Sequence, residues 1–160
     1  MTAAAHRALR SDVLRHAAAA AILCMATSGP ARGDVPPSVL HVVDDGIPEP
    51  LAAAPGDAAR GRALVVARDN ANCVLCHAVP DPAVRFSGNV GPSLAGVGGR
   101  LTAAQLRLRV ADNLRVNPDS VMPSYFKVAG LDRVAPSYAG KPILSAVEVE
   151  DLVAYLSSLR

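Results

Sequence analysis

The most regular hydrophobic pattern in the chain lies at its C-terminal end. Apolar residues recur there every three or four positions, which is the spacing of one buried face of a helix. These positions are Val149, Leu152, Val153, Leu156 and Leu159. Ser145 and Glu148 stand three residues apart just before the pattern and match a capping box, in which the two side chains bond each other's backbone amides. The pattern predicts an amphipathic helix that begins after Ser145.

A second capping box predicts a helix earlier in the chain. Thr102 and Gln105 have the capping spacing, and Leu101 and Leu106 are placed to form a hydrophobic staple across the helix start. We therefore expect a helix over residues 103 to 115, which ends before the Asn-Pro pair at 117 and 118.

The first predicted helix starts after Asp57, a residue type that often caps helices. Over residues 58 to 69 one face carries Gly61, Leu64, Val65 and Arg68. No segment of the chain alternates apolar and polar residues as a half-buried strand would. The fold class predicted from these patterns is all-α.

Two stretches interrupt the helical pattern. Residues 34 to 55 are rich in proline and have little periodicity, so we expect an extended arm that either lies along a partner or is a flexible leader. Pro80 and Pro82 stop any helix in the middle of the chain, and "GNVGPSLAGVGGR" reads as a tight loop.

The first 33 residues have the order of a secretory signal peptide: basic residues, a short apolar run and then small residues. The apolar run from Ala17 to Thr27 is shorter than the roughly 20 residues of a spanning helix, although an uncleaved anchor is the alternative. Cys24 belongs to this discarded segment. The predicted organisation is a signal peptide at 1–33, the arm at 34–55 and one domain at 56–160, with the mature protein in the periplasm.

Removal of the leader changes the charge of the chain. Four of its arginines lie in residues 1 to 33, so the formal net charge falls from +2 to about −1. The basic character of the full chain therefore gives no support to a nucleic-acid-binding function.

The sequence "ANCVLCHAVP" carries the chemistry of the chain. Cys73, Cys76 and His77 cannot supply the four ligands of a structural zinc site or of an iron–sulfur cluster. A redox disulfide or an inert cysteine pair remains possible, but C-x-x-C-H is also the attachment motif of a c-type haem, whose proximal iron ligand is the histidine. The chain has no tryptophan and only 3% aromatic residues, and one large apolar cofactor would fill such a core. We therefore expect one covalently bound haem c.

A six-coordinate haem iron needs a second axial ligand. Met122 is the sole methionine after the leader, and it lies in a proline-bounded loop, "NPDSVMPSYF". A thioether ligand opposite a histidine raises the reduction potential of a haem. The alternatives are His41 in the arm, or an open five-coordinate iron, which a haem peroxidase would need.

Together the stretches "NCVLCH", "GPSLAGVGGR", "MPSYF" and "GKPILSAVEVEDLVAYLSSL" resemble class I cytochromes c, and among these the SoxX family of monohaem subunits of SoxAX sulfur-oxidising complexes. The resemblance covers roughly residues 56 to 160. It implies that the Pro92 carbonyl accepts a hydrogen bond from His77, and that Gly61 lets the first and last helices cross closely.

The resemblance also implies a partner and a reaction. The partner would be a SoxA-type cytochrome subunit in a heterodimer, and the complex, an L-cysteine S-thiosulfotransferase, oxidatively conjugates thiosulfate to a cysteine of a carrier protein. This chain would accept electrons and have no catalytic residues of its own. The alternatives are a free-standing electron-transfer cytochrome and, in another class, a haemless CxxC thiol oxidoreductase.

Basic residues gather in and beside the predicted helix at 103 to 115. They are Arg100, Arg107, Arg109 and Arg115. The ordinary expectation for such a run is a solvated helix face, and the alternative is contact with a docking partner or with a haem propionate. Arg100 is the candidate for a haem contact.

Overall fold

The computed structural model describes residues 33–160, so the predicted signal peptide lies almost wholly outside the described residues. The elements, in chain order, are α2 (Ala58–Val66), η1 (Cys73–Leu75), α3 (Val97–Arg100), α4 (Ala103–Asp112), η2 (Asn113–Arg115), η3 (Pro136–Tyr138) and α5 (Ala146–Ser158). The described residues contain no strand, only an isolated bridge between Val43 and Gly46, so the predicted all-α class is confirmed. Within 33–160 no helix has the length and apolar character needed to cross a membrane.

All three predicted helix starts are confirmed. Asp57 accepts hydrogen bonds from two backbone amides in the first turn of α2. The Thr102–Gln105 capping box is formed at the start of α4, and the Ser145–Glu148 box at the start of α5. These caps are local signals, because both partners lie within three residues of each other.

Two of the helices end earlier than expected. α2 stops at Val66 because Ala67 has an extended backbone, and the polar residues that follow turn the chain toward the cysteine motif. Asn72, at the end of this turn, has a positive φ of 55°, a conformation that asparagine tolerates better than most residues. α4 ends at Asp112, and residues 113 to 115 tighten into the 3₁₀ helix η2.

The glycine-rich stretch predicted as a loop contains a short helix, which corrects the prediction. α3 spans Val97–Arg100, and Leu159 accepts a hydrogen bond from the Gly98 amide. A Cβ at Gly98 would collide with the backbone carbonyl of Ser157 in α5. The glycine therefore lets α3 lie directly against the end of α5, a contact that local sequence alone does not predict.

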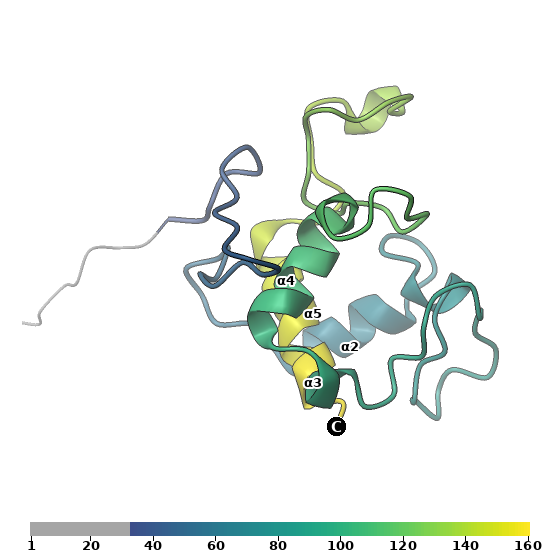
Figure 1. Ribbon diagram of the computed structural model, residues 1–160. Coiled ribbons are helices and arrows are strands. Elements are labelled where there is room, and N and C mark those ends of the chain that lie inside the picture. The colour runs from purple at the N-terminus through teal and green to yellow at the C-terminus, as the bar shows by residue number, and fades with distance from the viewer. Residues whose placement is uncertain (1–32) are drawn as a thin grey trace, which may run out of the picture. The chain divides into compact units, whose positions relative to one another are not determined.

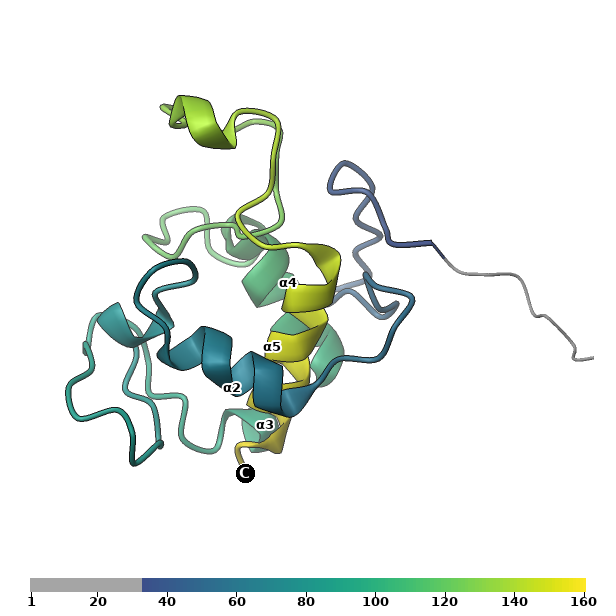
Figure 2. The same ribbon diagram turned by 180° about the vertical axis from the view of Figure 1, so that it is seen from behind.

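The C-terminal helix α5 is the centre of the core. It contacts α2, α3 and α4, and Figures 1 and 2 show it between α2 on one side and α4 on the other. Four of the five residues that predicted this helix are buried, namely Val149, Leu152, Val153 and Leu156. Leu159 lies at the C-cap and is partly buried against the same core.

Residues 34 to 55 form no helix, and they pack against the domain. Ile47 and Leu51 are each only 1% exposed. The Ile47 amide donates to the Ala104 carbonyl of α4 at 2.9 Å, and the Leu51 amide donates to the Glu150 carboxylate of α5 at 2.8 Å. The arm is therefore partly built into the core of its own domain, because it carries apolar side chains that the helices bury.

Arg107 is buried, contrary to the expectation of a solvated arginine face. Its guanidinium makes a bidentate ion pair with Glu150, at 2.7 and 2.9 Å, and also donates to the Ile47 carbonyl at 2.6 Å. Both charged residues are 5% exposed. The pair joins α4, α5 and the arm at one point.

The segment that carries η3 extends away from the helices, as both ribbon views show (Figures 1 and 2). Its base is closed by a hydrogen bond of 3.0 Å from the Leu144 amide to the Tyr125 carbonyl. Tyr125 and Leu144 are buried, whereas nearly all residues from 129 to 141 are exposed.

Candidate haem site

A cavity of about 690 Å³ lies between the cysteine motif, α4, α5 and the loop that follows α4. This volume falls in the range of ordinary cofactor sites. Most of the wall is apolar, and its aliphatic members include Val65, Val97, Leu106, Val110, Leu152 and Leu156. All of the site residues predicted from the sequence line it. They are Cys73, Cys76, His77, Pro92, Arg100 and Met122.

The cysteine motif forms one tight helical turn at the edge of the cavity. The His77 amide donates to the Cys73 carbonyl at 2.9 Å, which closes one helical turn, and Cys73, Cys76 and His77 all line the cavity. No disulfide joins Cys73 and Cys76. Burial raises the pKa of the Cys73 thiol to about 11, because a low-dielectric environment disfavours the thiolate.

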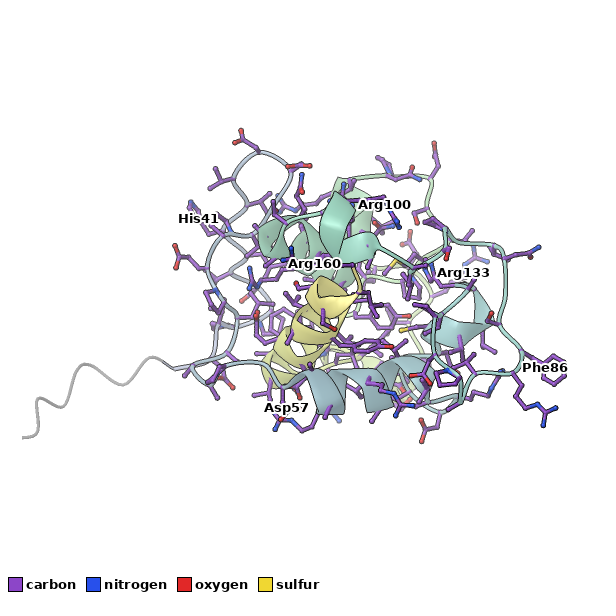
Figure 3. All side chains as sticks on the ribbon, turned by 90° about the horizontal axis from the view of Figure 1, so that it is seen from below. His41, Asp57, Phe86, Arg100, Arg133 and Arg160 are labelled. Carbon is purple, nitrogen blue, oxygen red and sulfur yellow. The ribbon has the colours of Figure 1, made fainter. Side chains whose placement is uncertain are left out.

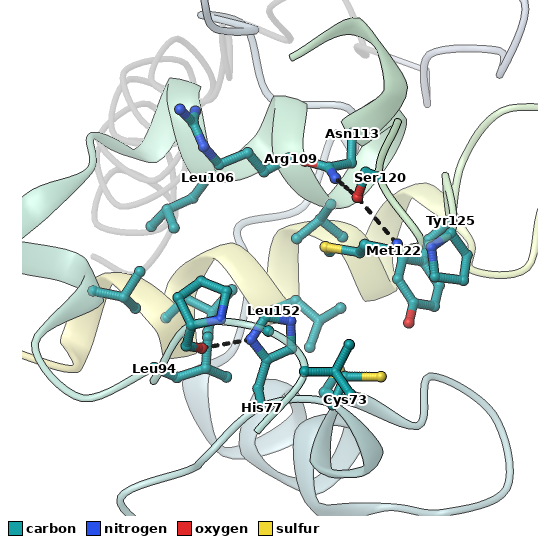
Figure 4. Close-up of a pocket in the computed structure, with 18 of the residues that line it drawn as sticks. Cys73, His77, Leu94, Leu106, Arg109, Asn113, Ser120, Met122, Tyr125 and Leu152 are labelled. Atoms are coloured by element: carbon teal, nitrogen blue, oxygen red, sulfur yellow. Dashed lines mark hydrogen bonds between the residues drawn. The ribbon is translucent and has the colours of Figure 1, made fainter. Parts of the chain in front are cut away.

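The imidazole of His77 is held by the loop that follows the motif. Its Nδ1 lies 2.7 Å from the Pro92 carbonyl oxygen, and this contact appears as a dashed line in Figure 4. A carbonyl can only accept a hydrogen bond, so Nδ1 carries the proton and Nε2 is left with a free lone pair. This is the tautomer that a metal-binding imidazole needs.

Two glycines allow this loop to approach the motif, and the sequence analysis had not singled them out as site residues. A Cβ at Gly91 would collide with the His77 ring, and one at Gly88 would collide with the Leu75 carbonyl. The Gly88 and Gly91 amides donate to backbone carbonyls within the motif at 2.9 and 2.8 Å. Glycine in a loop beside a histidine motif is the signal that could have identified them.

Met122 lies across the cavity from His77. Figure 4 shows the two side chains on facing walls, with the Met122 sulfur directed into the space between them. Met122 is partly buried and packs against the core cluster. His41, the alternative ligand, is exposed and is not among the residues that line the cavity, and Figure 3 shows it on the arm.

Part of the wall comes from a face of α4 that the sequence analysis did not assign to the site. In α4 and just after it, the lining residues are Leu106, Arg109, Val110 and Asn113. Ala104, Arg107 and Leu108 of the same helix face the arm or the core instead. These lining residues recur every three or four positions, which predicts a buried helix face. The spacing does not distinguish a face covered by protein from one covered by a cofactor.

Arg100 lies at the rim of the cavity. Its guanidinium donates to the Ala95 carbonyl at 2.5 Å and to the Ser93 carbonyl at 2.9 Å. Both acceptors belong to the loop that carries Pro92. Arg100 therefore braces this loop with two of its five N–H groups and keeps the others for further partners.

The residues around the cavity fit a haem c. The two cysteines and the histidine of one turn line the cavity, the Met122 thioether faces the imidazole, and most of the remaining wall is apolar, as a large flat apolar macrocycle requires. Among residues 33–160 no three His, Cys, Asp or Glu side chains gather in a way that could hold a metal ion by themselves. The His77 and Met122 side chains therefore suit an iron ion whose other ligands come from a porphyrin.

Comparison with known proteins agrees with this geometry. The family model described as "Cytochrome c" matches residues 58–160. The fold is similar to that in the crystal structure of SoxXA from P. pantotrophus, with a TM-score of 0.73 and 34% sequence identity over 79% of this chain and 98% of that chain. Among curated protein sequences, none matches this chain. The chain therefore belongs to the cytochrome c family, with a class I fold, and is an electron-transfer protein of the SoxX type.

Proposed function

We propose that the chain is a periplasmic cytochrome with a single haem c, and that it is the electron-accepting subunit of a SoxAX-type complex. That complex oxidatively conjugates thiosulfate to a cysteine of a carrier protein. The observation that carries the proposal is the facing pair of His77 and Met122 across an aliphatic cavity with two thiols at its edge. The single C-x-x-C-H motif supports a count of one haem.

Each residue of the site has a role in this proposal. Cys73 and Cys76 would hold the cofactor through thioether bonds, His77 would present Nε2 to the iron, and Met122 would present its sulfur from the opposite wall. When bound, the haem supplies reversible one-electron chemistry at its iron.

The surrounding chain keeps these donors in place. Pro92 fixes the proton of His77 on Nδ1, which orients the ring and makes Nε2 more basic. Arg100 holds the Pro92 loop and lies where its remaining N–H groups can meet a propionate. The aliphatic residues of α4 and α5 give the cavity a largely apolar wall, which would limit the access of water to the cofactor.

The proposed partner is a SoxA-type cytochrome. Its support is the likeness to a chain of SoxXA, which this sequence covers almost completely. In the described residues the only thiols are Cys73 and Cys76, and both are assigned to haem attachment. The substrate chemistry of the complex therefore falls to the partner, and this chain takes electrons from it.

The haemless thiol oxidoreductase is disfavoured by the state of its cysteines. Thiol–disulfide exchange needs an accessible thiolate, and reactive cysteines have depressed pKa values. Burial shifts the pKa of Cys73 the other way, to about 11. The turn at η1 is also followed by extended chain and prolines rather than by a long helix.

The cofactor and the leader can be tested on one preparation. The full chain is expressed in a bacterium that exports and matures c-type cytochromes, and the product is denatured and weighed by mass spectrometry. We expect one haem retained on the polypeptide and an N-terminus between Ala26 and Asp34. A mass equal to the bare polypeptide would reject haem attachment, and an intact Met1 in the membrane fraction would reject cleavage.

The complex requires a separate test. The tagged holoprotein is purified from cells grown on thiosulfate, and co-purifying cytochromes are identified by haem staining. We expect a larger cytochrome in equal amount, and thiosulfate-dependent reduction of this chain's haem in the complex. Recovery of the chain alone, with full electron-carrier activity, would favour the free-standing cytochrome instead.

A further inference from the structure

The main chain of Met122 is held by a short hydrogen-bond relay. The Met122 amide donates to Ser120 Oγ at 3.1 Å, and the Asn113 side-chain amide donates to the same oxygen at 2.6 Å. Both bonds are drawn in Figure 4. Asn113, Ser120 and Met122 all line the cavity. The proposed distal ligand is thus tied to a side chain at the end of α4.

The relay closes a loop that has few other supports. Asn113 is the first residue beyond α4, and its carbonyl accepts a hydrogen bond from the Asn117 amide at 2.9 Å. The Ser120 amide in turn donates to the Asn117 carbonyl at 3.1 Å. Residues 116 to 119 are exposed, so no burial holds them. The position of Ser120 therefore depends on these few polar contacts.

A second anchor lies on the other side of Met122. The Tyr125 amide donates to the Val110 carbonyl at 3.1 Å, and its hydroxyl donates to the Ala71 carbonyl at 2.6 Å. Tyr125 is buried, and Pro123 restricts the backbone between the two anchors. Met122 therefore lies between two fixed points of the chain: the Asn113–Ser120 relay before it and the buried Tyr125 after it.

We propose that Ser120 and Asn113 are positioning residues that set the approach of the Met122 sulfur to the haem iron. The inference rests on the proposed function, because it assigns a role to the surroundings of the proposed distal ligand. When the Ser120 hydroxyl is removed, the Met122 amide loses its acceptor in a partly buried loop. The loop then moves more easily away from the cavity, and the distal side of the iron opens to small external ligands.

The test uses the oxidised holoprotein and two spectroscopic readouts: the weak sulfur-to-iron absorption band and the dissociation constant of added imidazole. Ser120→Ala should weaken the band and bind imidazole about fivefold more tightly, the effect expected from one lost hydrogen bond. Ser120→Thr keeps the hydroxyl and should restore both readouts. Asn113→Ala should act in the same direction, and the double variant should show less than the sum of the two effects.

Ser137→Ala is the matched control. Ser137 is exposed in η3 and does not line the cavity, so the same substitution there should leave both readouts unchanged. Unchanged imidazole affinity in both Ser120→Ala and Asn113→Ala would overturn the inference while leaving Met122 as the ligand. If Ser120→Ala yields no holoprotein, the imidazole affinity of Asn113→Ala alone tests the inference, and an unchanged affinity overturns it. A wild-type protein without the band would overturn the proposed Met122 ligation itself, and the inference with it.

Discussion

Gly61 in α2 packs directly against the backbone carbonyl of Asp151 in α5, and no Cβ would fit between them. The resemblance to class I cytochromes c implied this close crossing of the first and last helices, and the structure shows it. The crossing matters for the haem site because α2 ends just before the cysteine motif, whereas α5 supplies Leu152 and Leu156 to the cavity wall. The distance between the two helices therefore sets one dimension of the site.

We expect Gly61→Ala to destabilise the holoprotein by about 1–3 kcal/mol, because the added methyl group forces the two helices apart. Gly99→Ala is the control, since a Cβ at Gly99 meets nothing within 4 Å and alanine favours a helix over glycine by up to about 1 kcal/mol. Denaturant unfolding followed by far-UV circular dichroism measures both. Equal stability of the two variants would contradict the role of the crossing.

Gly91→Ala tests the proximal side of the site. The new methyl group would displace the His77 ring and weaken its hydrogen bond to Pro92. A less basic imidazole stabilises the ferric iron less, so the reduction potential should rise, and the yield of holoprotein should fall. Spectroelectrochemical titration gives the potential. A potential and a yield equal to those of the wild type would show that the ring has room to adjust.

The ion pair of Asp151 predicts how stability depends on pH. Burial alone would raise the pKa of the Asp151 carboxyl, but the hydrogen bonds from Arg60 and from the Asp57 amide outweigh it and lower the pKa. A depressed pKa contributes stability above the ordinary aspartate pKa of about 3.9, and that stability is lost as the pH falls through the lower folded value.

We therefore expect the free energy of unfolding to fall more steeply below about pH 4 in the wild type than in Asp151→Asn. Asp132→Asn is the control because Asp132 is exposed in the protruding segment. Unfolding curves at a series of pH values measure the slope. Parallel slopes for the wild type and Asp151→Asn would contradict the prediction.

The buried pair of Arg107 and Glu150 predicts that the arm contributes to stability. Arg107→Met leaves the Glu150 carboxylate buried without its charged partner, with only the Leu51 amide as donor, and removes the donor to the Ile47 carbonyl, which should cost about 3–5 kcal/mol. Arg115→Met is the matched control, because the Arg115 side chain is 57% exposed in its pair with Asp112 and should cost less than about 1 kcal/mol. Similar losses in both variants, measured by denaturant unfolding, would show that the buried pair and its bond to the arm stabilise the fold no more than an exposed ion pair does.

Local signals account for the parts of the fold that were predicted correctly. The caps at Asp57, Thr102 and Ser145 involve partners within three residues, and the C-x-x-C-H motif is contiguous. The facing position of Met122 could be proposed because no other methionine follows the predicted leader at residues 1–33. These inferences need no knowledge of the tertiary structure.

The parts that were missed depend on contacts between distant segments. Arg107 meets Glu150 across 43 positions of sequence, and the arm residue Leu51 meets Glu150 across 99. Ile47 and Leu51 lie in a proline-rich stretch where no helical or strand period marks them as core residues. The relay through Ser120 joins residues only two and seven positions apart, and it was missed for another reason: no sequence pattern marks one loop serine as the acceptor of two donors.

Met122→Ala tests the ligand assignment and the electron route together. The variant should lose the sulfur-to-iron band of the oxidised protein, and its reduction potential should fall, because a thioether stabilises the ferrous state better than the water or amine that replaces it. His41→Ala should leave both readouts unchanged, since His41 is exposed and is not among the residues that line the cavity. In the proposed complex, Met122→Ala should slow turnover without preventing assembly, because the proposal has this subunit accept electrons and leaves the substrate chemistry to the partner. Full turnover with an altered spectrum would keep the ligand and reject the electron route, whereas an unaltered spectrum would reject Met122 as the ligand.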